Sequence, residues 1–128
     1  MAFLIDTNVA IHVRDGDRPT TSRVAALKGA VMISVVTRVE LEGGVYREPA
    51  NVVARRARLD VMLAAIPTLA FDEDAATRYG VIVAHAGYSR RKLLDRMIAA
   101  QALAHKATLV TFNAADFSDV PGLRLQAW

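Results

Sequence analysis

The chain has 128 residues, of which 53% are hydrophobic and 23% charged, so it is long enough and apolar enough to fold around its own core. It contains no cysteine, which excludes disulfides, zinc–thiolate sites and iron–sulfur clusters. The formal net charge of +3 makes the chain mildly basic, which permits a polyanionic partner without requiring one.

Apolar runs and turn signals predict strands and helices that alternate along the chain. Short apolar runs predict strands at residues 2–5, 31–35 and 108–112, an extended stretch at 67–71 and a final strand at 123–126. Apolar spacing and capping residues predict helices at 7–13, 21–28, 37–47, 51–65, 72–86 and 93–105. Strands that are apolar on both faces and alternate with helices predict an α/β fold, with a parallel sheet covered by helices in one domain, 1–128.

Four carboxylates map to the carboxyl end of the predicted strands. Asp6 directly follows the first strand, and Glu40 lies in the first turn of the helix after the second strand. Asp95 starts an alanine-rich helix, and Asp116 follows strand 108–112 by four residues. Carboxylates that share this edge repel one another unless a cation lies among them, and oxygen ligands without cysteine favour Mg²⁺ or Mn²⁺. Such a site can activate water to hydrolyse a phosphodiester.

Each carboxylate also has a structural explanation when it is taken alone. Asp6 could cap the helix that follows it, and Glu40 could complete a capping box in which Thr37 is the N-cap. Asp95 could interact with the positive end of its helix, and Asp116 could be a turn residue. The shared position of the four side chains at one edge of the sheet is what favours a metal site.

Four segments resemble the motifs of PIN-domain proteins, in order and at the expected spacing. They are Phe3–Val9, Ile33–Gly43, Asp95–Ala100 and Leu109–Phe117, and the ending Val120–Trp128 is typical of the VapC-type toxins within that family. The resemblance implies a three-layer PIN fold with a mostly parallel central sheet and a Mg²⁺- or Mn²⁺-dependent endoribonuclease that cleaves RNA. It also implies a homodimer and inhibition by a VapB-type antitoxin.

The resemblance also assigns roles to individual residues. The acidic metal-site residues would be Asp6, Glu40, Asp95 and Asp116, and the polar residues that support the site would be Asn8, Thr111 and Asn113. Many relatives carry a glycine-containing, weakly charged loop before the third aspartate, whereas this chain has Arg90, Arg91 and Lys92 there. This basic run could hold RNA phosphates or could be a solvated loop. Arg55, Arg56 and Arg58 most simply form an exposed helix face, with contact to RNA or antitoxin as the alternative.

Other functions remain open on the sequence. A PIN-like protein could bind RNA without cutting it, and an acidic pocket could belong to a phosphoacceptor domain, although the acceptor aspartate of such domains usually follows a middle strand. A dehalogenase-like phosphatase would need an aspartate where this chain has Asn8. The residues before Asp6 are too few for a signal peptide, and no apolar run approaches the roughly 20 residues of a membrane span, so we expect a cytoplasmic protein.

Overall fold

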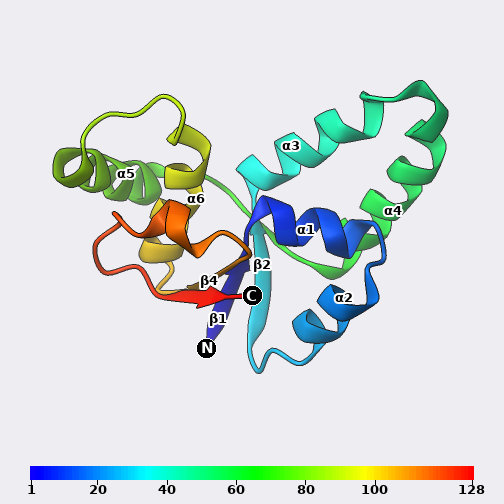
Figure 1. Cartoon of the computed structure of the whole chain (residues 1–128), viewed down its shortest axis with the longest axis horizontal. Helices are drawn as coiled ribbons and strands as arrows, with labels where there is room; N and C mark the ends of the chain where they lie inside the picture. Colours follow the sequence, from blue (N-terminus) through cyan, green and yellow to red (C-terminus); the bar gives the residue numbers. More distant parts are fainter.

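The computed structural model describes all 128 residues and contains one sheet of five parallel strands (Figure 1). The strands are β1 (Ala2–Ile5), β2 (Ala30–Ser34), β3 (Thr68–Leu69), β4 (Thr108–Thr111) and β5 (Leu125–Ala127). Their order in the sheet is β3-β2-β1-β4-β5, so β1 is central and pairs with both β2 and β4. The predicted α/β fold with a parallel sheet is confirmed.

Six α-helices and two short 3₁₀ helices surround the sheet. They are α1 (Thr7–Arg14), α2 (Arg18–Ala25), α3 (Val35–Tyr46), α4 (Val52–Ala65), α5 (Glu73–Ala86) and α6 (Leu93–Ala104), with η1 at Pro49–Asn51 and η2 at Ala114–Phe117. Figure 1 shows α5 and α6 on one side of the sheet and α1 to α4 on the other. None of the six α-helices has the length and apolar character that a membrane crossing requires.

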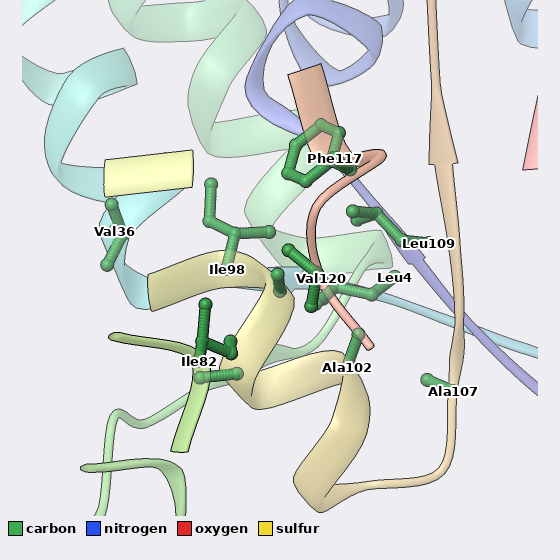
Figure 2. Packing of buried hydrophobic residues seen from close by; sticks show 11 residues of the cluster. Leu4, Val36, Ile82, Ile98, Ala102, Ala107, Leu109, Phe117 and Val120 are labelled. Atoms are coloured by element: carbon green, nitrogen blue, oxygen red, sulfur yellow. The ribbon is translucent and has the colours of Figure 1, made fainter. Parts of the chain in front are cut away.

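The central strand contributes to both hydrophobic cores, because successive side chains of a strand point to opposite faces of the sheet. Leu4 packs in the core beneath α5 and α6, whereas Phe3 and Ile5 pack in the core beneath α1, α3 and α4. In the first core, Ile98 and the fully buried Ala102 of α6 belong to the same cluster as Leu4 (Figure 2). Small residues on this face let α6 pack close to the sheet, which brings the start of α6 near the carboxyl ends of β1 and β4.

Two helices begin earlier than predicted, and each has a different N-cap residue from the predicted one. Helix α2 begins at Arg18 rather than near residue 21, because the Asp17 side chain accepts a hydrogen bond from the Thr20 N–H at 3.2 Å. Its proline lies in the first turn, where a missing N–H costs nothing. Helix α3 begins at Val35, and its N-cap is Ser34 rather than Thr37. The predicted capping box between Thr37 and Glu40 is therefore wrong.

Candidate active site

Asp6 lies where the central strand β1 ends and α1 begins, and it is only 6% exposed. Its Oδ1 accepts a hydrogen bond from the Val9 N–H at 3.1 Å, so Asp6 caps α1. Its Oδ2 accepts a hydrogen bond from the Thr111 hydroxyl at the end of β4. The Thr111 oxygen in turn accepts from the Asn113 N–H at 2.9 Å, which orients the hydroxyl toward Asp6.

The buried position of Asp6 makes its negative charge costly. Burial raises the pKa of Asp6 above its usual range, and the nearby Asp116 charge raises it further. Hydrogen bonds from Thr111 and from the backbone of Val9 and Asn8 oppose this shift, but they do not cancel it. The exposed side chain of Asn8 makes no hydrogen bond to the carboxylates, so the contribution of Asn8 comes through its backbone.

Asp95 lies in the first turn of α6 and is half-buried. Burial raises the pKa of Asp95, and the charges of Asp116, Asp6 and Glu40 raise it further, while Lys92 opposes them. All four predicted carboxylates therefore lie close enough together to interact electrostatically. The structure brings them to one place from β1, α3, α6 and η2.

Asp95 and the exposed Asp116 line a small cavity of about 80 Å³, together with Arg91 and Lys92. The cavity is large enough for an ion with a few water molecules. The Lys92 ammonium donates a hydrogen bond to Asp119 Oδ2 at 3.1 Å, so it is held beside the two carboxylates. Arg90 does not line this cavity. We call this space the acidic cavity.

Glu40 reaches the site by a contact that the sequence did not suggest. Its Oε1 accepts a hydrogen bond from the Thr7 hydroxyl at 2.9 Å, and the same hydroxyl lies 2.9 Å from that of the buried Thr37. Thr7 is not among the predicted site residues, and Thr37 was predicted only as a helix cap. The signal for Thr7 was its position directly after Asp6, and the signal for Thr37 was its place one helical turn before Glu40.

The donor set fits a hard divalent cation. All four side chains offer carboxylate oxygens, and the pKa values of Asp6 and Asp95 are raised by burial and like charges that a cation would offset. No three acidic or histidine side chains converge as closely as the direct ligands of one ion would. Mg²⁺ usually retains several waters in protein sites, so carboxylates at this spacing can hold it partly through water.

The comparisons with known proteins agree with the fold and with the motifs. The PIN domain matches residues 3–123. The chain is 31% identical to the tRNA(fMet)-specific endonuclease VapC of Shigella flexneri and 27% identical to ribonuclease VapC2 of Rickettsia felis, over 100% of this chain and 98% of each relative. DNA-bound VapBC from Salmonella typhimurium superposes with a TM-score of 0.85 at 26% identity, over 100% of this chain and 98% of the matched one. This chain belongs to the PIN-domain family and, within it, to the VapC-type ribonuclease toxins.

Proposed function

We propose that the endoribonuclease activity of this chain depends on Mg²⁺ or Mn²⁺, held by Asp6, Glu40, Asp95 and Asp116. The observation that carries the proposal is the state of Asp6, a buried carboxylate at the end of the central strand whose pKa is raised by burial. A buried charge of this kind is costly unless a cation accompanies it. When bound, the ion would supply an activated water and neutralise charge that develops on the phosphate.

Residues of the chain would orient the carboxylates and bind the RNA phosphate. The Thr111 hydroxyl and the start of α1 hold Asp6 in one orientation, because each donates a hydrogen bond to one of its oxygens and leaves that oxygen a further lone pair. Thr7 holds only Oε1 of Glu40, which leaves Oε2 free to accept a proton or to orient a water. Arg91 and Lys92 border the acidic cavity and would bind the non-bridging oxygens of the scissile phosphate.

Transfer RNA is the first substrate to test, because two of the relatives are named tRNA(fMet)-specific endonucleases. Several solved relatives are toxin–antitoxin complexes, and some of these are bound to DNA. We therefore propose that a VapB-type antitoxin binds this chain and inhibits it, and that the chain acts as a homodimer. These partners follow from the family and not from a contact within the chain.

The phosphoacceptor alternative is disfavoured by the proteins that the chain resembles. In the sheet, β1 is the middle strand, so the position of Asp6 alone would suit an acceptor aspartate. However, the PIN domain matches residues 3–123, and relatives that match the whole chain are named ribonucleases or endonucleases. The other alternative, RNA binding without cleavage, requires an assay.

The test is to incubate the chain with labelled cellular RNA, including a tRNA pool, in Mn²⁺, Mg²⁺ or EDTA. We expect cleavage only with metal, and we expect Asp6→Asn to lower the rate by more than the ~100-fold typical of residues that merely orient a ligand. Asp17→Asn is the matched control, because Asp17 caps α2 as Asp6 caps α1 and asparagine caps equally well. A folded Asp6→Asn protein that cuts RNA at the normal rate would refute the assignment.

A further inference from the structure

A second cavity, larger than the acidic cavity, lies directly beside the proposed metal site. It has a volume of about 480 Å³ and is formed by α1, α3 and α4. Thr7 and Glu40 line one side of it, so it adjoins the proposed metal site. The rest of its lining includes Gly43 and three arginines, Arg14, Arg47 and Arg55. We call this cavity the arginine cleft.

Arg14 is an unusual cation because its side chain is only 5% exposed. Its Nε donates a hydrogen bond to Asp15 Oδ1 at 3.0 Å, and that partner side chain is 50% exposed. The two Nη groups of Arg14 have no hydrogen-bond partner in the protein, and neither is sealed from solvent. A guanidinium held in place with two free donors is prepared to bind an anion bidentately.

The other two arginines of the arginine cleft also keep free donors. Arg55 donates one hydrogen bond, from Nη1 to the Gly44 carbonyl at 2.9 Å, and exposed Arg47 makes no ion pair. Arg56 on the same helix is different, because Glu42 and Asp60 both pair with it and neutralise it. Arg47 and Arg55 therefore bring charges that no carboxylate pairs with to the arginine cleft, whereas Arg14 pairs through Nε with Asp15, which also lines the cleft.

We propose that the arginine cleft binds a phosphate of the RNA strand next to the scissile phosphate. The proposal rests on the ribonuclease function proposed above, because it places the scissile phosphate at the acidic cavity. An RNA strand carries a phosphate at every nucleotide, so a strand that crosses Glu40 from one cavity to the other presents a second phosphate to the arginines. Contacts of this kind set the position of the strand and do not read its sequence.

Substitution of Gly43 can test the proposed phosphate site without removing any existing contact. A Cβ at Gly43 would meet no atom within 4 Å, so a side chain there enters open space in the arginine cleft. Gly43 lies inside α3, where replacing glycine does not cost helix propensity. Gly43→Glu adds a negative charge, and Gly43→Gln adds the same bulk without charge. Gly80→Glu is the control, because Gly80 is an equally open glycine inside α5.

The experiment measures the affinity of the intact chain for a fluorescent single-stranded uridine oligonucleotide over a range of salt concentrations in EDTA. We expect Gly43→Glu to weaken binding several-fold and to reduce the slope of log affinity against log salt by about 0.7, the value for one phosphate contact on a single strand. Gly43→Gln should have a smaller effect, and Gly80→Glu should bind like the unmodified chain. In Mn²⁺, Gly43→Glu should raise KM for RNA cleavage more than it lowers kcat.

Binding in EDTA separates this proposal from the ribonuclease proposal. If the unmodified chain cuts no RNA but binds it in a manner that depends on position 43, the phosphate site stands and the proposed activity fails. An unchanged slope in Gly43→Glu, or an equal loss in Gly80→Glu, would overturn the phosphate site. A hexaglutamate peptide that loses binding in Gly43→Glu, while RNA binding is unchanged, would overturn it in favour of an acidic protein segment.

Discussion

Gln101 of α6 is completely buried and joins three parts of the fold. Its Oε1 accepts a hydrogen bond from the Ser34 hydroxyl, and its Nε2 donates to the carbonyls of Leu69 and Ala70, each at 3.1 Å. The same Ser34 oxygen caps α3 by accepting from the Val36 N–H at 2.9 Å. Gln101→Leu keeps most of the volume and removes all three hydrogen bonds.

The expected cost of Gln101→Leu follows from the groups that lose a partner. These are the hydroxyl of Ser34 and the carbonyls of Leu69 and Ala70, and each lost hydrogen bond costs about 1 kcal/mol, or more where the group stays buried. We therefore expect the free energy of unfolding to fall by about 3–4 kcal/mol. For a chain of this size the loss corresponds to roughly 10–15 °C in Tm.

Urea unfolding followed by circular dichroism measures this change, and the m-value should stay constant. Gln126→Leu is the control, because the Gln126 side chain on β5 makes no hydrogen bond, and we expect a change within about 0.5 kcal/mol. Ser34→Ala should lose less than Gln101→Leu, and the double variant should lose less than the sum. A loss below about 1 kcal/mol in Gln101→Leu would show that the Gln101 network does not stabilise the fold.

Two further predictions concern charge. Burial raises the pKa of Asp6 and Asp95, so the metal-free native state retains protons that the unfolded chain has released, and its stability falls as the pH rises through the raised pKa values. Mn²⁺ should therefore raise Tm more at neutral than at acid pH, and equal shifts would contradict this account. Asp119→Ala removes the carboxylate that holds buried Arg96, whose other partner is the Gly87 carbonyl, and urea unfolding should show a loss of about 2 kcal/mol. If Asp119→Ala lowers the free energy of unfolding no more than Asp74→Ala does at an exposed position, the proposed role of Asp119 is wrong.

The alternation of strands and helices was enough to predict the sheet and the edge at which the carboxylates meet. In a parallel α/β sheet every strand ends at the same edge, so Asp6 and Asp116 could be placed there without knowing the strand order. Asp6 also shows that two explanations treated as alternatives can both hold. It caps α1 through Oδ1 and accepts from Thr111 through Oδ2, and each of these oxygens keeps a further lone pair, so the structural role does not exclude a role in metal binding.

The start of α3 could not be predicted, because the choice of cap depends on contacts that are distant in sequence. Ser34 and Thr37 are both good N-cap residues, and local preferences do not separate them. In the folded chain Ser34 lies beside Gln101, 67 residues away, and Thr37 lies beside Thr7, 30 residues away. These partners make Ser34 the cap and leave Thr37 to support Glu40.

The position of Glu40 is the part of the site that its own helix does not explain. A glutamate in a capping box folds back on the start of its helix, whereas Glu40 Oε1 accepts its hydrogen bond from Thr7 of α1, the residue directly after Asp6. Holding an exposed glutamate in one orientation costs side-chain entropy, and stability alone gives little reason for that cost. Glu40 contributes to the electrostatics of Asp95 on one side and lines the arginine cleft on the other. A carboxylate restrained at that boundary agrees with the proposal that a strand of RNA passes over it, with one phosphate at the proposed metal site and the next at the arginine cleft.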